Sequence, residues 1–295
     1  MVGHPHPIGF GVVHPHGDFR DRLRPPAAHR PRSVAAGRQF PCNPSRQVPI
    51  LAPVLGHQLI ILGDAHLGAV PAATEEALVA FLDVVPDLGD CLLINGDLFD
   101  FWFAYRRAVP RRGFRIAGQL AALGRRLPIV MTGGNHDRWG DSFWEAECGI
   151  RFSRDRIRFG VGSRIVEAHH GDGLTEQRWV ARGLHRITRS PVTSAVFRNL
   201  PADLGLWLVD RFSHHLNQQP RDEAAIGRAA EAQCQWAEAR LTAEPDLGLL
   251  VLGHTHQPAL TEPSPGQHYL NPGAWLDGLR YATAGDDQVR LAQFS

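Results

Sequence analysis

The 295-residue chain contains no lysine, so all 31 of its basic residues are arginine. We attribute this mainly to a GC-rich coding bias, although the guanidinium group also suits bidentate phosphate binding. Cysteine is scarce, and no pair has CxxC or zinc-finger spacing, which argues against a cysteine zinc site and favours reduced thiols in a cytoplasmic protein. The cysteines are Cys42, Cys91, Cys148 and Cys234.

Long apolar runs are also missing. No stretch approaches the ~18 apolar residues of a membrane span, and the short run at 8–13, flanked by His-Pro pairs, does not match a signal peptide. The net charge of +1 hides an asymmetry: residues 1–47 carry seven Arg against two Asp (+5), and the remainder carries 24 Arg against 28 acidic residues (−4). A mildly acidic remainder argues against nucleic-acid binding by bulk charge.

Two regions differ in composition. Residues 1–47 are rich in Pro, His, Arg and Gly without a hydrophobic period, which predicts a disordered leader; metal binding by its His-Pro-His repeats is an alternative. Residues 48–295 are predicted to form one domain, because short apolar runs alternate there with helical patterns, as in an α/β layered fold. Strands are predicted at 58–62, 91–94, 128–131, 164–167 and 249–252, and helices at 74–85, 113–126 and 222–242.

Residues 174–217 form an insertion of another kind. Four arginines recur there at spacings of 4, 4 and 3, the spacing of one helix face. A dense apolar cluster that includes Trp207 follows between 204 and 212. The arginines are Arg178, Arg182, Arg186 and Arg189.

Five short polar clusters each follow an apolar run. Ligand sites in open α/β sheets form outside the carboxyl ends of strands, so five strands ending at one edge would bring the clusters together. In an extended segment, side chains at i and i+2 point the same way, so Asp-x-His and His-x-His would each supply two ligands to one metal. The clusters are Asp64-Ala65-His66, Gly96-Asp97-Leu98-Phe99-Asp100, Gly134-Asn135-His136-Asp137, His169-His170-Gly171-Asp172 and Gly253-His254-Thr255-His256.

The donor set of these clusters is oxygen and nitrogen without sulfur, which suits Mn²⁺, Fe or Zn²⁺. Seven ligands exceed the needs of one tetrahedral site, so two metals bridged by a carboxylate fit better. Two metals about 3.5–4 Å apart clamp the attacking and leaving oxygens of a phosphoryl displacement. Each cluster alone has a structural explanation, such as a helix N-cap or a left-handed turn. Their conjunction, in order along the chain, predicts a two-metal phosphoesterase.

Together the clusters resemble the motifs of the calcineurin-like metallophosphoesterase superfamily, over roughly residues 57–283. The resemblance implies an α/β fold, a four-layer αββα sandwich with a helical cap insertion. The ligands that it implies for a first metal are Asp64, His66, Asp97 and His256. Those that it implies for a second metal are Asn135, His170 and His254, with Asp97 bridging the two.

The same resemblance implies the catalytic residues. His136 corresponds to the acid that protonates the leaving oxygen, and Asp137 would orient it. His170 is taken as the ligand in preference to His169, because the family ligand directly precedes Gly-Asp. An intact ligand set also argues against a non-catalytic scaffold, which would be expected to lose ligands or the general acid.

A narrower resemblance, to the UDP-2,3-diacylglucosamine hydrolase branch, rests on the segments 95–103, 169–174, 253–258 and 269–273. It implies a small-molecule substrate, an acylated nucleotide sugar cleaved at its pyrophosphate with two divalent metals, usually Mn²⁺, to UMP and 2,3-diacylglucosamine 1-phosphate in lipid A biosynthesis. Arg178, Arg182 and Trp207 would then contact substrate, with peripheral contact at the inner face of the cell membrane.

Alternatives remain open at this stage. The best-known members of the branch carry Arg where this chain has His136, so another phosphodiester, a phosphomonoester or a dinucleotide polyphosphate stays an alternative substrate. Trp207 and its apolar neighbours either pack the cap onto the core or bind acyl chains. The arginines that follow the second cluster either reach substrate phosphate or form a solvated loop; they are Arg106, Arg107, Arg111 and Arg112.

Overall fold

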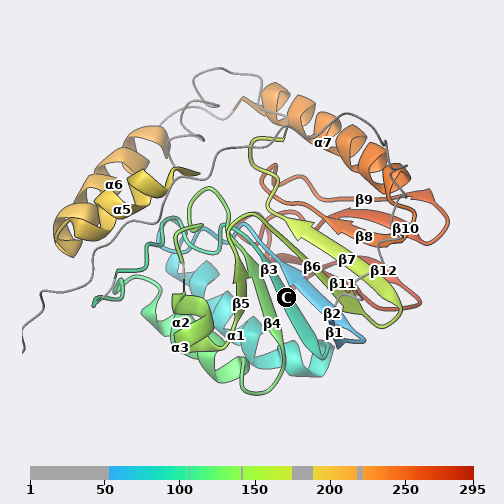
Figure 1. The fold of residues 1–295 in the computed structure, drawn as a ribbon, viewed down its shortest axis with the longest axis horizontal. Coiled ribbons are helices and arrows are strands. Elements are labelled where there is room, and N and C mark those ends of the chain that lie inside the picture. The colour runs from blue at the N-terminus through green and yellow to red at the C-terminus, as the bar shows by residue number, and fades with distance from the viewer. Residues whose placement is uncertain (1–52, 106, 141, 175–188, 218–221) are drawn as a thin grey trace, which may run out of the picture. The chain divides into compact units, whose positions relative to one another are not determined.

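The computed structural model describes residues 53–105, 107–140, 142–174, 189–217 and 222–295. The predicted leader, residues 1–47, and two predicted substrate contacts, Arg178 and Arg182, lie outside this part of the chain. The described residues form two six-stranded sheets with helices on their outer faces (Figure 1).

One sheet has the order β12-β11-β2-β3-β4-β5, in which β2 to β5 run parallel and β11 and β12 are antiparallel to their neighbours. Leu62 pairs with Ile94 and Ile94 with Met131, so β2, β3 and β4 end at the same level. Residues that directly follow these strands therefore start side by side. The strands are β2 (Leu59–Leu62), β3 (Cys91–Asn95), β4 (Ile129–Thr132), β5 (Arg151–Ser153), β11 (Arg280–Ala284) and β12 (Val289–Gln293).

The second sheet has the order β1-β6-β7-β8-β10-β9. Its centre is parallel, because β7 and β10 both run parallel to β8. β6 is antiparallel to β7 and parallel to β1, and the edge strand β9 is antiparallel to β10. The strands are β1 (Val54–Gly56), β6 (Arg156–Val161), β7 (Arg164–His169), β8 (Leu247–Val251), β9 (Ala259–Ser264) and β10 (Gln267–Asn271).

Three apolar cores hold the four layers together. The alternation of side chains along a strand sends Ile60 and Leu62 of β2 toward the helices and Leu59 and Ile61 into the core between the sheets. The helices α1 (Ala72–Leu88), α2 (Phe114–Leu123) and α3 (Phe143–Cys148) cover the first sheet. The helix α7 (Glu223–Ala243) covers the second. The predicted four-layer αββα sandwich is therefore confirmed.

Sequence patterns explain the two long helices. On α1, Leu78, Phe81, Leu82 and Val85 are buried at the spacing of one helix face. On α7, the Asp222 side chain accepts a hydrogen bond from the Ala225 backbone N–H and caps the first turn. Its buried stripe is Gln233, Ala237 and Leu241, four residues apart. One member of that stripe is polar, which matters for the site.

The insertion is helical where the structure describes it, with α5 (Pro191–Asn199) and α6 (Ala202–Asn217). We call residues 174–217 the cap. The cap helices contact the segment after β3: the Phe197 and Phe103 rings lie 5.8 Å apart, and the Tyr105 hydroxyl donates to the Ala202 carbonyl at 3.5 Å. Across the described residues, no helix is both long and apolar enough to span a bilayer.

The predicted strands are present as β2, β3, β4, β7 and β8, and the predicted helices as α1, α2 and α7. The prediction of one common edge was wrong. The first three strands belong to one sheet and β7 and β8 to the other, so the clusters come from the ends of two sheets. A short apolar run that is buried on both faces carries no information about which sheet it joins.

Candidate metal centre

The polar clusters meet in three groups, two of which share His66, and within each group the candidate ligand atoms lie within 4.8 Å of one another. Two of the groups are tied together by carboxylates. Asp64 Oδ1 lies 3.3 Å from His256 Nε2 and 3.9 Å from His170 Nε2, while Asp97 Oδ2 lies 3.0 Å from His170 Nε2 and 3.7 Å from His66 Nε2. The groups are Asp64–His66–His256, Asp97–His170–His254 and His66–Asp100–His136.

His254 and His256 join different groups, so the expectation that this pair holds one metal twice was wrong. The reason is local: both residues have positive φ, 70° and 57°, and are not extended. Asp64, His66 and Asp97 also have positive φ, between 46° and 50°. A left-handed backbone conformation is unfavourable for residues that carry a Cβ atom. It persists only where the surrounding structure enforces it, typically at functional sites. Five of the seven predicted ligands carry this strain.

The loop after β4 holds the Asp97 carboxylate. The His136 backbone N–H donates to Asp97 Oδ1 at 2.8 Å. Gly134 is required beside it, because a Cβ there would come within 2.0 Å of the same oxygen. Gly96 has φ 79°, and a Cβ there would meet the His170 ring at 2.6 Å. Glycine therefore allows the backbone to approach the carboxylate and the imidazole closely.

The Asp137 carboxylate makes contacts other than the predicted one with the His136 ring. It accepts from backbone N–H groups of Gly134 at 2.8 Å, Leu98 at 2.7 Å and Asp97 at 3.2 Å. It thus fastens the loop after β3 to the loop after β4. The His136 ring is held instead by Asp100, whose carbonyl oxygen lies 2.7 Å from His136 Nδ1. The Asp100 carboxylate adds further contacts, at 3.7 Å to His136 Nδ1 and 3.9 Å to His66 Nδ1.

A buried polar network holds the loop after β8 from the α7 side. The Gln233 side chain, 1% exposed, donates to the Gly253 carbonyl at 3.1 Å and accepts from Tyr269 Oη at 3.1 Å, Asn271 Nδ2 at 3.2 Å and Thr255 Oγ1 at 3.4 Å. Sequence reasoning missed both Gln233 and Asp100 as site residues. The available signals were a glutamine on the buried stripe of α7 and the second aspartate of Gly-Asp-x-x-Asp.

The electrostatics of the centre favour positive charge. Burial would lower the pKa of His170, but the Asp97 and Asp64 carboxylates hold it well above its usual value. Burial would raise the pKa of Asp97, but His170 and His136 hold it well below the usual range. Burial and the neighbouring His170 lower the pKa of His254 to about 4. The two buried carboxylates create the negative field in which a divalent cation is stable.

The residues present fit two metal ions. Buried atoms of four predicted ligands make no hydrogen bond among the described residues, although buried polar atoms are normally paired; the atoms of Asp64 and His170 lie 3.0–3.9 Å from other candidate ligands without making one. A coordinating cation satisfies such atoms, and the oxygen and nitrogen donors match Mn²⁺, Fe or Zn²⁺. The atoms are Asp64 Oδ1, His66 Nε2, Asn135 Oδ1 and His170 Nε2.

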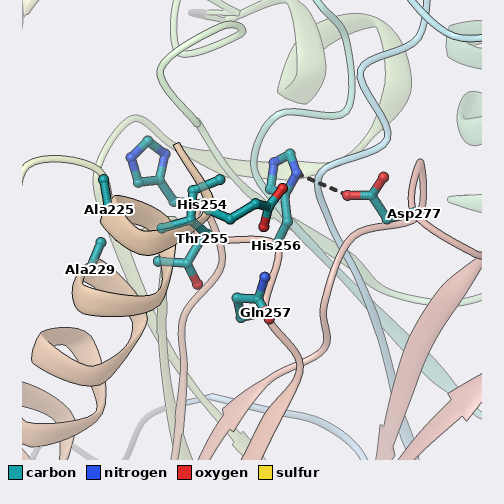
Figure 2. Close-up of a pocket in the computed structure, with 9 residues that line it drawn as sticks. Ala225, Ala229, His254, Thr255, His256, Gln257 and Asp277 are labelled. Atoms are coloured by element: carbon teal, nitrogen blue, oxygen red, sulfur yellow. Dashed lines mark ion pairs between the residues drawn. The ribbon is translucent and has the colours of Figure 1, made fainter. Parts of the chain in front are cut away.

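Two cavities border the cluster. We call the first the α7 cavity. It has a volume of about 480 Å³, and His254 and His256 are among the residues that line it (Figure 2). The second, the cap cavity, holds about 280 Å³ and is lined by Asp100, the loop before α2, and Ala202, Asp203 and Leu206 of α6. The cap cavity includes Asp100, whose carboxylate lies 3.7 Å from His136 Nδ1, and the α7 cavity includes His254 and His256, so each cavity reaches a different part of the cluster.

The predicted substrate contacts near the cap differ in position. Leu206 lines the cap cavity, whereas the neighbouring Trp207 is 59% exposed. Arg111 and Arg112 line the cap cavity. Arg189, from the predicted arginine face, lies 3.2 Å from Asp172 Oδ2, and Asp172 also pairs with the buried Arg138. Arg189 therefore joins the cap to the His-Gly-Asp cluster.

A model of the calcineurin-like phosphoesterase family matches residues 57–258. The chain belongs to this family and is a metal-dependent hydrolase. The UDP-2,3-diacylglucosamine hydrolase of Porphyromonas gingivalis is 25% identical over 219 residues, covering 68% of this chain and 83% of that protein. The protein of the same name from Sodalis glossinidius is 27% identical over 242 residues, covering 80% and 98%. Among solved structures, the Escherichia coli phosphoesterase YfcE aligns at 14% identity with a TM-score of 0.39, covering 81% and 100%.

Proposed function

We propose that this hydrolase cleaves the pyrophosphate of UDP-2,3-diacylglucosamine, giving UMP and 2,3-diacylglucosamine 1-phosphate. The observation that carries the proposal is the cap cavity, which places apolar walls and two arginines against Asp100 of the cluster. In an acylated sugar phosphate, the acyl chains need apolar walls and the phosphate needs a positive charge such as that of arginine. The names of the relatives that this chain matches over most of their length support the same substrate.

The proposed metal ligands are the seven residues of the cluster, with Mn²⁺ as the proposed metal. Two divalent ions would supply positive charge to the phosphate oxygens and lower the pKa of an attacking water molecule. The first position is assigned to Asp64, His66 and His256, and the second to Asn135, His170 and His254. Asp97 is proposed to bridge the two, and the position of its Oδ2, near both His66 and His170, supports this.

His136 is proposed as the general acid. A carbonyl oxygen only accepts, so the 2.7 Å contact with Asp100 requires a proton on His136 Nδ1. Nε2 is then the nitrogen that can deliver a proton to the leaving oxygen. Burial would lower the pKa of His136, but the Asp97 carboxylate and the Asp100 carbonyl raise it. The protonated form that an acid needs is therefore favoured.

The cap cavity is proposed to receive the acylated half. Its apolar lining includes Leu67, Phe101, Val109 and Leu206, and Arg111 and Arg112 offer guanidinium groups to the sugar phosphate. The cap helices also expose apolar side chains, Val192 and Val196 on α5 and Leu204, Trp207 and Leu208 on α6. These residues support the further proposal that the cap contacts the inner face of the cell membrane, where an acylated substrate resides.

The test uses purified full-length protein, Mn²⁺ and UDP-2,3-diacylglucosamine in detergent micelles, with an EDTA-treated control. We expect EDTA-sensitive release of UMP and 2,3-diacylglucosamine 1-phosphate in equal amounts. If a generic aryl phosphodiester is cleaved with Mn²⁺ while UDP-2,3-diacylglucosamine is not, the phosphoesterase stands and this substrate is wrong. The alternatives are then another phosphodiester, a phosphomonoester or a dinucleotide polyphosphate.

A further inference from the structure

The α7 cavity differs in chemistry from the cap cavity. Its wall on α7 is formed by Ala225, Ile226 and Ala229, and Ala225 and Ala229 lie on one helix face because they are four residues apart. Figure 2 shows Ala225 and Ala229 on α7, beside the loop that carries His254 and Thr255. Small side chains on a helix face leave a flat, apolar floor against which a planar ring can pack.

The rim of the α7 cavity is polar and acidic. It carries Glu223 at the start of α7, Gln257 after the histidine pair, and Asp277, whose carboxylate lies 3.4 Å from His256 Nδ1. No arginine lines this cavity among the described residues, in contrast with the cap cavity. Two carboxylates would repel a further phosphate group, but they accept hydrogen bonds from hydroxyl and imide N–H groups.

We propose that the α7 cavity binds the nucleoside part of the substrate. The inference rests on the proposed function, because a nucleotide sugar has one acylated and one nucleoside half joined by a diphosphate. With the diphosphate over the cluster, each half can extend into one of the two cavities that border it. The apolar, arginine-bearing cap cavity takes the acylated sugar, which leaves the α7 cavity for the base and ribose.

The residues then have distinct roles. The base packs on Ala225 and Ala229, Glu223 accepts from the ribose hydroxyls, and Gln257 offers both a donor and an acceptor to the imide edge of the base. A cavity of about 480 Å³ lies within the ~300–1,000 Å³ of small-molecule sites. Glu223 and Gln257 are therefore specificity-determining residues for the nucleoside.

The experiment measures dissociation constants for UMP, ribose 5-phosphate and inorganic phosphate by calorimetry on the Mn²⁺-loaded protein. In the wild type we expect UMP to bind at least tenfold more tightly than ribose 5-phosphate, the order of magnitude of one buried base contact. Ala229→Phe fills the floor and should raise the ratio of the UMP constant to the phosphate constant at least tenfold. Glu223→Ala, on an exposed side chain, should raise the same ratio about threefold to tenfold.

The matched control is Ala239→Phe, at an exposed position of α7 away from the cavity, which should leave the ratio unchanged. The assignment would be overturned if wild type and Ala229→Phe had the same ratio of UMP to phosphate dissociation constants. It would also be overturned if Ala229→Phe selectively lost affinity for 2,3-diacylglucosamine 1-phosphate. If UMP binding depends on Ala229 but UDP-2,3-diacylglucosamine is not cleaved, the nucleoside site stands and the proposed function fails. If the substrate is cleaved equally well by wild type and Ala229→Phe, the proposed function stands and the nucleoside site fails.

Discussion

Replacing Gln233 by leucine tests how the loop after β8 is held. Leucine has a similar volume, so the change removes the hydrogen bonds while leaving little cavity. The Gly253 carbonyl keeps Asn271 Nδ2 at 3.2 Å and the Thr255 backbone N–H at 2.8 Å, and Thr255 Oγ1 keeps Asn271 at 3.0 Å. The Tyr269 hydroxyl loses the acceptor that Gln233 provides.

The expected cost follows from these contacts. The Tyr269 hydroxyl loses its acceptor at a cost of about 1–3 kcal/mol, whereas the other three partners keep hydrogen bonds of their own, so Gln233→Leu should lower the free energy of unfolding by roughly 3 kcal/mol. For a domain of this size, that lowers Tm by roughly 6–12 °C. Gln235→Leu, at an exposed position on the same helix, is the control and should stay within about 0.5 kcal/mol of wild type.

A double-mutant cycle measures the coupling energy between Gln233 and Tyr269. Tyr269→Phe removes the orphaned hydroxyl, so adding it to Gln233→Leu should recover about 1–2 kcal/mol relative to the sum of the two single changes. Urea unfolding followed by circular dichroism measures all four proteins. Simple additivity would refute the proposed coupling between Gln233 and Tyr269. Since the network also fixes Gly253 and Thr255, Gln233→Leu should weaken Mn²⁺ binding about 10–100-fold in a metal titration.

Three further predictions follow from the site and the fold. Asp97→Ala should abolish hydrolysis and reduce bound metal measured by atomic emission, whereas retained metal would argue against a bridging role. His136→Ala should keep its metal while kcat falls about 10²–10⁴-fold, and full activity would remove His136 from the mechanism. For Asp90, partial burial would raise the pKa, but the backbone N–H groups of Gln58 and His57 outweigh it and lower the pKa. The stability that Asp90 adds is thus fully present above pH ~4 and is lost as the pH falls through the lowered pKa. Urea unfolding of wild type and Asp90→Asn should therefore differ at pH 7 and converge near pH 2, and a constant difference would contradict this.

Much of the fold could be predicted from the sequence because its strongest patterns are local. The runs at 91–94 and 128–131 are continuous apolar segments bounded by turn residues, and both are central strands. The edge strands β5 and β9 have mixed, half-exposed sequences that carry no such pattern. The division of strands between two sheets depends on long-range pairing, such as that of β11 with β2, which no short window contains.

The candidate site was predictable to the level of residue types and less so in its geometry. Motif spacing placed His254 and His256 together, but their assignment to different groups depends on left-handed backbone angles. The family resemblance implied that Asp137 orients the His136 ring. Its carboxylate instead turns to the N–H groups of the loop after β3, a contact made across about forty residues of chain.

The origin of the cluster on two sheets has a consequence for folding. The ends of β2, β3 and β4 supply one part of the centre and the ends of β7 and β8 the other, and the core between the sheets holds them together. Neither sheet alone can assemble the centre. Catalytic competence is therefore a property of the cooperative unit formed by both sheets, and an intermediate with a single ordered sheet would be inert whatever its secondary structure content.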